Sequence, residues 1–399
     1  MAAVKRALVV TVIVALCGGG AWGWTASRRE REYRQFIDHG EGALARDDTF
    51  AAVEAFSGAI ALRPDAMLGY LKRGEAYSRR HTLDASARDP LQTGELDPAA
   101  DAAMRDLRHA AELDPLATRP LESIGDISYA LRRYDRAAAR YQAYIALDDR
   151  SPRMLYKLGL AQYSAGRVPA AIRALEQAVA IDDRFGAGFY LLGLCYRDAQ
   201  RPRQALRALE TAVRIGPSML PAREELADLY TRIGRREEAL GQLEALAELD
   251  PGAPRQVALG LACARAGQFD RAVSILARAA ERYPDHASTY AALGRIWLEK
   301  TQTPDRLDLL KAIDALQAAA HADDSSETLT LLGQALLLSK EPVRAERVLQ
   351  QAAAKLPVDP MAFYYLATAA ERTGHPEVAR RALVDYRSLA GTSEPRRSR

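Results

Sequence analysis

Apolar and small residues recur three and four positions apart along most of the chain, in short runs interrupted by glycine or proline. The stretch from Leu158 to Asp183 shows the pattern clearly, because the periodic residues lie on either side of Gly166 and Pro169. Such spacing is typical of a helix, a break and a second helix. Glycine suits the position just after a helix, and proline suits the first turn of the next one. We therefore predict a helical hairpin.

The hairpin pattern recurs at a nearly constant spacing. One small residue in the first helix marks each copy: Gly40, Gly74, Gly125, Gly159, Gly193, Ala227, Gly260, Gly294, Gly333 and Ala367. Consecutive members are 34, 51, 34, 34, 34, 33, 34, 39 and 34 residues apart. A recurring period of 34 predicts about ten stacked hairpins between residues 33 and 390.

The residues around the small position carry a family resemblance. The fifth copy has Phe189, Leu192, Gly193 and Tyr196, followed by Ala205, Leu209, Ala212 and Pro217. This pattern resembles a tetratricopeptide repeat (TPR). The resemblance implies an all-α fold, a right-handed α-solenoid in which each hairpin buries its apolar face against its neighbours. Some copies depart from the pattern, with His39 where leucine is usual, Tyr144 where alanine is usual, and Asp149, Asp183 and Asp324 where proline is usual.

Two longer steps in the series locate insertions. The step of 51 places 17 extra residues near 81–98 in the second copy, and the step of 39 places a net 5 extra residues near 301–308 in the eighth. Both fall between the first and second helices of their hairpins, so they are expected to project from the same edge. Residues 391–399 are basic and polar and are expected to be a disordered tail.

Charge and cysteine content narrow the classes of function. The 55 basic and 52 acidic residues leave a net charge of only +3, which does not favour binding to nucleic acid. Basic runs such as Arg28–Arg34 are interleaved with acidic residues. We expect these runs to be solvated helix faces with i,i+4 ion pairs. Cys195 and Cys263 lie two repeats apart, about 20 Å at the usual helix spacing, too far for a disulfide. They are predicted to be buried thiols.

An uncharged run of 18 residues, 7–24, precedes the repeats within a segment 1–27 that has the layout of a signal anchor or signal peptide. The favoured interpretation is one retained N-terminal hydrophobic helix that acts as a single-pass membrane anchor, with Trp22 and Trp24 at the membrane–water interface. The first alternative is a lipoprotein lipidated at Cys17. The second is cleavage and export as a soluble protein.

The side of the membrane is ambiguous from sequence. Arg28, Arg29, Arg31 and Arg34 outnumber Lys5 and Arg6, which favours repeats in the cytoplasm. The signal-like layout favours the opposite side. The prediction adopts the extracytoplasmic side and keeps the cytoplasmic one as the alternative.

No catalytic, cofactor-binding or metal-binding motif is present. The six histidines are scattered, and neither a P-loop nor a nucleophile elbow occurs. Gly40 to Ala45 imitate a dinucleotide-binding turn, but the repeat register places them inside a helix. The chain is therefore predicted not to be an enzyme and to need no cofactor, with a site assembled from distant residues as the remote alternative.

The resemblance implies that first helices line a concave groove that binds a segment of another protein. The register turns aromatic and aliphatic residues toward it: Tyr129, Tyr156, Leu160, Tyr163, Tyr190, Leu194 and Arg197. Charged residues share these positions: Arg119, Glu122, Asp126, Arg153, Glu224, Asp228 and Arg232. Such a strip suits an apolar helix or peptide with an acidic rim. The alternative is that these residues pack between repeats.

Together, these features predict a membrane-tethered TPR scaffold of bacterial type that assembles other proteins at the cell envelope. An exported lipoprotein or secreted assembly factor is the alternative. Its partners are expected to be proteins or peptides in the groove and the membrane through residues 7–24. No nucleic acid or small-molecule substrate is expected.

Overall fold

The computed structural model describes residues 27–86, 98–300 and 306–392, apart from the side chains of 81–86 and 391–392. The described residues form helices and no strand, so the all-helical prediction is confirmed. The first described helix covers residues 27–45. The others are α2 (Thr49–Leu62), α3 (Met67–Ser86), α4 (Pro98–Leu113), α5 (Thr118–Ala130), α6 (Tyr134–Leu147), α7 (Pro152–Ser164), α8 (Val168–Ile181), α9 (Gly186–Asp198), α10 (Pro202–Ile215), α11 (Leu220–Arg232), α12 (Arg236–Leu249), α13 (Ala253–Arg265), α14 (Phe269–Arg282), α15 (Ala287–Glu299), α16 (Arg306–Ala322), α17 (Ser326–Leu338), α18 (Pro342–Ala353), α19 (Pro360–Thr373) and α20 (Pro376–Thr392).

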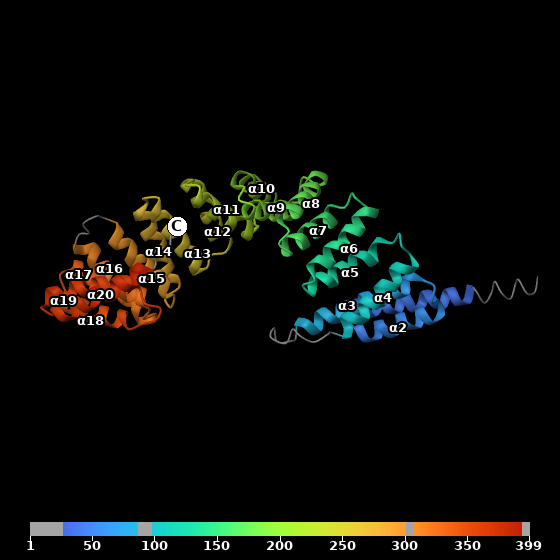
Figure 1. The fold of residues 1–399 in the computed structure, drawn as a ribbon, viewed down its shortest axis with the longest axis horizontal. Helices are drawn as coiled ribbons and strands as arrows, with labels where there is room; N and C mark the ends of the chain where they lie inside the picture. Colours follow the sequence, from blue (N-terminus) through green and yellow to red (C-terminus); the bar gives the residue numbers. More distant parts are fainter. Residues whose placement is uncertain (1–26, 87–97, 301–305, 393–399) are drawn as a thin grey trace, which may run out of the picture. The chain divides into compact units, whose positions relative to one another are not determined.

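The helices pair into hairpins in chain order, and we number the resulting repeats 1 to 10 from the N-terminus (Figure 1). The chain divides into two compact units, Met1–Ile215 with repeats 1–5 and Gly216–Arg399 with repeats 6–10. Within each unit, each labelled helix packs against the next one along the chain. The small residue that marks each repeat is called position 8, and the other positions of the repeat are numbered along the chain from it. In repeat 4, for example, Gly159 is position 8 and Leu175 is position 24; inserted residues in repeats 2 and 8 are left out of the numbering.

The first helices form the inner face of each unit. In unit 1, α3 contacts α5 and α7 contacts α9; in unit 2, α13 contacts α15, α15 contacts α17, and α17 contacts α19. Consecutive second helices make no comparable contact in the described part of the chain. Because the first helices lie closer together than the second ones, each stack curves around its first helices.

A close approach of the two helices holds each hairpin together. A Cβ atom added at Gly159 would lie 2.7 Å from Cγ of Leu175, and one at Gly193 would lie 2.7 Å from Cγ of Leu209. Both leucines lie on the second helix, at position 24 of their repeats, and both are almost completely buried. The same relation holds in every repeat that has glycine at position 8. Glycine is therefore required there because the large side chain at position 24 fills the space of a Cβ atom.

The two repeats with alanine at position 8 differ in this packing. In repeat 6, Ala227 is paired with Leu243, and in repeat 10, Ala367 is paired with Leu383. Both leucines are only half-buried, whereas the position-24 residues opposite glycine are at most 2% exposed. Where alanine adds a methyl group at position 8, the leucine at position 24 of the second helix is thus less enclosed.

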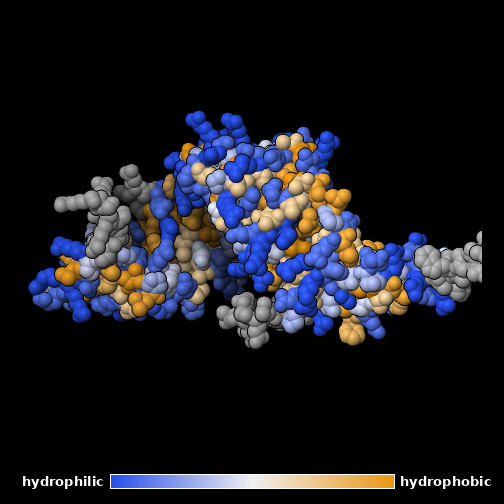
Figure 2. Space-filling view, turned by 45° about the vertical axis from the view of Figure 1, so that its right-hand side comes forward, coloured by the Kyte–Doolittle hydropathy of each residue, from blue (hydrophilic) through white to orange (hydrophobic). Residues whose placement is uncertain are grey.

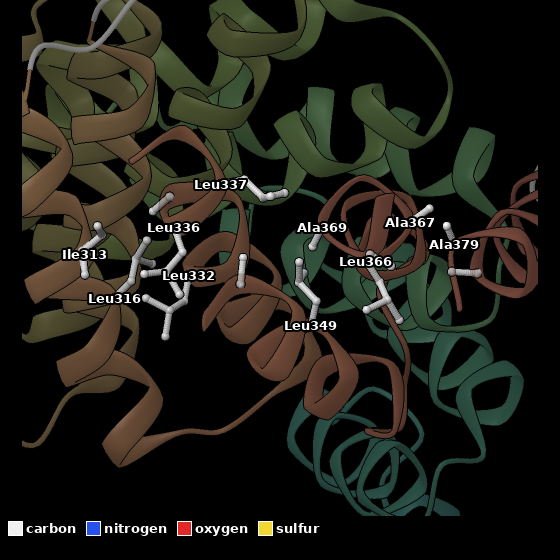
Figure 3. Packing of buried hydrophobic residues seen from close by; sticks show 14 residues of the cluster. Ile313, Leu316, Leu332, Leu336, Leu337, Leu349, Leu366, Ala367, Ala369 and Ala379 are labelled. Carbon is white, nitrogen blue, oxygen red and sulfur yellow. The ribbon is translucent and has the colours of Figure 1, made fainter. Parts of the chain in front are cut away.

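Between repeats, the core is continuous along each stack. In repeats 8–10, Figure 3 shows Leu316 of α16 together with Leu332 and Leu336 of α17 gathered in one cluster. The same cluster continues through Leu349 of α18 and Leu366 of α19. Hydrophilic and hydrophobic residues are interspersed over the face in Figure 2, as expected for a protein whose core lies between the stacked helices.

The turn inside a hairpin requires a residue with positive φ at position 15. Gly166 fills this place in repeat 4, with φ of 74°. In repeat 5 the residue is Gln200, with φ of 57°, a conformation that a residue with a side chain adopts at a cost. The prediction of a glycine-mediated turn is therefore confirmed in repeat 4, while the geometry is kept in repeat 5 without glycine.

The predicted single-pass membrane location is contradicted. Among the described residues, no helix is both long enough and apolar enough to span a membrane. The physical reason is that most described helices are shorter than the roughly 20 residues that a span needs, and the longest, α3, contains Lys72, Arg73 and Glu75. Residues 7–24 and Cys17, on which that prediction and the lipidation alternative depended, lie outside the described residues.

The structure also bears on the predicted insertion near 81–98. Helix α3 continues to Ser86, so the first residues of that segment extend the first helix rather than forming a loop. Residues 87–97, 301–305 and 393–399 lie outside the described residues, and the predictions of projecting loops and a disordered tail stay predictions there.

Replacing Gly193 with alanine should destabilise the fold. Overpacking against the buried Leu209 side chain costs about 1–3 kcal/mol, more than the roughly 0.5–1 kcal/mol that alanine contributes over glycine inside a helix. Urea unfolding followed by circular dichroism should show a lower midpoint. Gly241→Ala is the matched control, because no atom lies within 4 Å of a Cβ atom added there; it should raise the midpoint, and a loss in both variants would contradict the packing explanation.

Gln200→Gly should stabilise repeat 5 by about 0.5–1 kcal/mol, since glycine adopts positive φ without the steric cost that glutamine has. The same unfolding assay measures it. Gly166→Ala, which introduces that cost in repeat 4, should shift the midpoint in the opposite direction. Equal effects of the two substitutions in the same direction would show that backbone conformation is not the cause.

Candidate functional site: the inner faces of the two units

The inner face of unit 1 carries ion pairs that link consecutive first helices. We call this set the charged ladder: Glu41–Lys72, Glu75–Arg119, Glu122–Arg153, Glu122–Lys157 and Asp126–Lys157. Arg119 Nε lies 2.8 Å from Glu75 Oε1, and Lys157 Nζ lies 2.7 Å from Asp126 Oδ2. Each cation of the ladder comes from the repeat that follows its acid. The charges are therefore largely neutralised within the protein.

Asp126 is the most connected member of the charged ladder. It accepts hydrogen bonds from Lys157 Nζ and from the hydroxyl of Tyr141, 2.7 Å away. Burial and the hydrogen bond to Asp126 raise the pKa of Tyr141 well above its usual value, which keeps the phenol protonated as the donor. A hollow of about 460 Å³ beside these residues is lined by Glu75, Arg119, Glu122, Asp126 and Arg153, so it is a charged surface.

The seven predicted groove residues all lie in unit 1, on three consecutive first helices: Tyr129 on α5; Tyr156, Leu160 and Tyr163 on α7; Tyr190, Leu194 and Arg197 on α9. We call this set the aromatic strip. None of the seven is fully exposed and none is fully buried. The seven side chains are half-buried on first helices, and their role in binding a partner stays a prediction.

Several members of the aromatic strip pack between repeats. The ring of Tyr156 lies edge-on to Phe185 at the start of α9, with ring centroids 5.3 Å apart, and burial raises the pKa of the Tyr156 phenol. The Tyr129 hydroxyl lies 3.1 Å from Ser164 Oγ. Tyr129 and Tyr156 therefore serve inter-repeat packing, the alternative that the sequence left open.

Tyr163, Arg197 and Asp198 form a polar cluster at one end of the strip. Tyr163 Oη donates a hydrogen bond of 2.7 Å to Asp198, and Arg197 Nε donates one of 2.9 Å to the same carboxylate. Burial and the bond to Asp198 raise the pKa of Tyr163 to about 12. Burial also raises the pKa of Asp198, but the hydrogen bonds from Tyr163 and Arg197 outweigh it, so the pKa of this carboxyl is lowered. Arg197 is thus already engaged with a carboxylate.

Unit 2 has a different inner face. A hollow of about 230 Å³ is lined by aliphatic residues of three first helices, with Val257 and Leu261 on α13, Ala291 on α15 and Leu331 on α17. Polar residues complete the lining: Ser288, Asp323, Ser325 and Thr328. Arg295 and Glu327 form an ion pair across it. We call this surface the unit-2 groove.

A second hollow, of about 360 Å³, lies beside α13 on the same inner face. Leu243 and Leu246 of α12 and Pro254 and Ala258 of α13 line it, together with charged side chains at the rim. Arg255 pairs there with Glu224. Leu243 is the leucine opposite Ala227, so the hollow occurs where the packing within a hairpin is less tight.

Sequence reasoning did not select the residues of the unit-2 groove. Val257, Leu261 and Ala291 occupy positions 5 and 9 of the first helices, the same positions as Tyr156 and Leu160 in repeat 4. Counting from Gly260 and Gly294 would have found them, but small aliphatic residues gave no chemical signal. Of the predicted charged residues in unit 2, Glu224 contacts Arg255, whereas Asp228 pairs with Arg232 along its own helix.

The described residues contain no group of three or more His, Cys, Asp or Glu side chains that could hold a metal ion. Cys195 and Cys263 are free and completely buried, so the prediction of buried thiols is confirmed. Burial raises the pKa of Cys195 to about 12, which keeps it in the unreactive thiol form at neutral pH.

Family models described as tetratricopeptide repeat match residues 123–186, 330–388, 196–263 and 253–296. The chain belongs to the tetratricopeptide repeat family, whose members are generally non-catalytic scaffolds for protein interactions. No curated protein matches the chain.

Similar solved structures include YrrB, described as a TPR protein with an unusual peptide-binding site, at 25% identity over 47% of this chain and 96% of that one, with a TM-score of 0.40. PilF from Pseudomonas aeruginosa is 21% identical over 57% and 96% of the two chains, with a TM-score of 0.42. A tetratricopeptide repeat protein from Parabacteroides merdae is 15% identical over 67% and 99%, with a TM-score of 0.45.

Lys157→Met should destabilise unit 1 by about 1–2 kcal/mol, because it removes charge-assisted hydrogen bonds from Asp126 and Glu122 in a partly buried place. The side chains of Lys157 and Glu122 are only 22% and 17% exposed. Arg34→Met, which breaks an exposed pair with Glu30, should leave the urea midpoint unchanged. If both variants shifted the midpoint equally, burial would not be what gives the charged ladder its strength.

Proposed function

We propose that the protein is a TPR scaffold that binds an extended segment of a partner protein in the unit-2 groove. The observation that supports this best is a hollow in which aliphatic side chains from three first helices lie beside polar ones, with one ion pair across it. Apolar walls favour partner side chains through the hydrophobic effect, and a few polar groups fix orientation. The charged ladder of unit 1 offers less, because its ions are already paired with one another.

The chemistry of the lining indicates the kind of segment that fits. Ala291 and Ser288 leave room on the floor of the groove, whereas Val257, Leu261 and Leu331 supply apolar contacts. A segment with small or medium aliphatic side chains would fill the hollow, and its backbone or a polar side chain would contact Arg295 and Glu327. Aliphatic contacts from several first helices would then contribute to a single binding surface.

The aromatic strip of unit 1 is a second candidate surface. Leu160, Tyr190 and Leu194 are half-buried on two neighbouring first helices, α7 and α9. An apolar helix is the occupant that this surface would favour. The sequence-based prediction of a recognition site there stays a prediction.

The experiment that tests the unit-2 groove uses peptides selected from a random library on the full chain. Ala291→Gln places a longer polar side chain in the hollow and should weaken binding of the selected peptides about tenfold or more, since it removes space without removing core packing. Affinities can be measured by fluorescence anisotropy. Ser274→Gln on the exposed side of α14 is the matched control and should leave affinity unchanged.

Leu160→Glu combined with Tyr190→Ala tests the aromatic strip with the same peptides. Loss of binding in this variant but not in Ala291→Gln, with circular dichroism unchanged in both, would contradict the unit-2 groove and favour the strip.

A further inference from the structure

The N-terminal end of unit 1 carries an unfilled hollow of about 580 Å³. Phe36 of the first described helix and Ala51 and Ala55 of α2 form its apolar part, and Glu32 and Glu54 are among the polar residues that line it. Phe36 is 39% exposed. No described helix covers this surface, which we call the head face.

The repeat register identifies the head face as a repeat-docking surface. Phe36, His39 and Ala55 occupy positions 4, 7 and 23 of repeat 1, and the same positions of repeat 4 hold Leu155, Leu158 and Ala174. Those three residues are 2%, 4% and 4% exposed. In repeat 1, Phe36 is 39% exposed and His39 is exposed, whereas Ala55 is already as buried as Ala174.

What covers them in repeat 4 is the hairpin that precedes it. Leu158 and Ala174 lie in one core cluster with Ala138 and Tyr141 on α6, the second helix of repeat 3. The head face therefore has the residues that accept a preceding second helix. His39 at position 7, which departs from the usual leucine, is exposed because repeat 1 has no such helix among the described residues.

The C-terminal end of unit 2 presents the complementary side of the same junction. Positions 21, 24 and 28 of a second helix face the following repeat, as Ala138, Tyr141 and Ile145 do in repeat 3. In α20 these positions hold Arg380, Leu383 and Arg387. We call the outer surface of α19 and α20 the tail face.

Apolar surface remains on the tail face. Leu383 is half-buried, and Tyr364 and Tyr386 lie beside each other with ring centroids 5.5 Å apart. Tyr364 is 43% exposed. An apolar centre with arginines around it therefore lies at one end of the chain, and an apolar centre with glutamates around it lies at the other.

We propose that the head face binds the tail face of a second copy of this chain, so that copies associate head to tail through the junction that joins repeats within the chain. Arg380 and Arg387 of one copy would approach Glu32 and Glu54 of the next. The present partners of Glu32 and Arg380 are Arg28 and Glu377 in exposed pairs, which exchange at little cost. A symmetric pairing of two head faces would instead bring glutamates together. Head-to-tail contact is heterologous and can continue beyond a dimer.

Sedimentation velocity of the full chain over a wide concentration range tests the proposal. The wild-type chain should form species that grow with concentration. A head-reversed variant, Glu32→Arg with Glu54→Arg, and a tail-reversed variant, Arg380→Glu with Arg387→Glu, should each associate about tenfold or more weakly, because like charges then face each other. Arg203→Glu with Glu248→Arg, at exposed positions of α10 and α12, is the matched control and should associate like wild type.

An equimolar mixture of the two reversed variants provides the decisive measurement. In the mixture, each head face meets a tail face of opposite charge on the other variant, so association should return to near the wild-type strength. A chain that stays monomeric at every concentration contradicts the proposal and indicates that the head face is filled within the chain or by another protein. Association that neither charge reversal weakens also contradicts the proposal. So does a loss of association that mixing the two variants fails to restore. None of these results depends on the unit-2 groove, since Ala291→Gln leaves both end faces unchanged.

Discussion

The contact between position 8 of a first helix and position 24 of the second is the constraint on which each hairpin depends. Glycine at position 8 lets side chains such as Leu175 and Leu209 reach the backbone of the opposite helix, where no Cβ atom would fit. With the hairpin fixed in this way, the residues at positions 4, 7 and 23 are held in place to receive the preceding repeat. Stability therefore arises from many similar short-range contacts rather than from one central core.

Where alanine replaces glycine at position 8, the leucine at position 24 contributes to a hollow or to an exposed apolar face. Leu243 opposite Ala227 lines the hollow beside α13, and Leu383 opposite Ala367 lies on the tail face. A less enclosed leucine at position 24 leaves apolar area that a neighbouring hairpin does not take up. The hollow beside α13 and the tail face are thus associated with alanine at position 8, whereas the unit-2 groove lies on repeats 7 to 9, which keep glycine there.

The fold could be predicted from the sequence because its determinants are local. Gly159 and Leu175 are 16 residues apart, and the period of 34 repeats their relation along the chain. Local signals were weaker where the backbone overrode residue preference, as at Gln200, which adopts positive φ without being glycine. They also failed at α3, where the first helix continues to Ser86 because neither glycine nor proline occurs between His81 and Ser86.

The candidate site could be predicted only in part, because its character depends on which charges meet between repeats. The sequence indicated i,i+4 pairs, and Arg28 with Glu32 is one, but the pairs that shape the inner face join residues 31 to 44 positions apart, as Lys157 does with Asp126 and Arg119 with Glu75. From the sequence, an arginine on the inner face is available to a partner protein. The structure shows that its charge is paired with an acidic residue on the adjacent helix, as Arg119 is with Glu75. Such pairing consumes the charges of unit 1, whereas the aliphatic residues at positions 5 and 9 that line the unit-2 groove gave no chemical signal in the sequence.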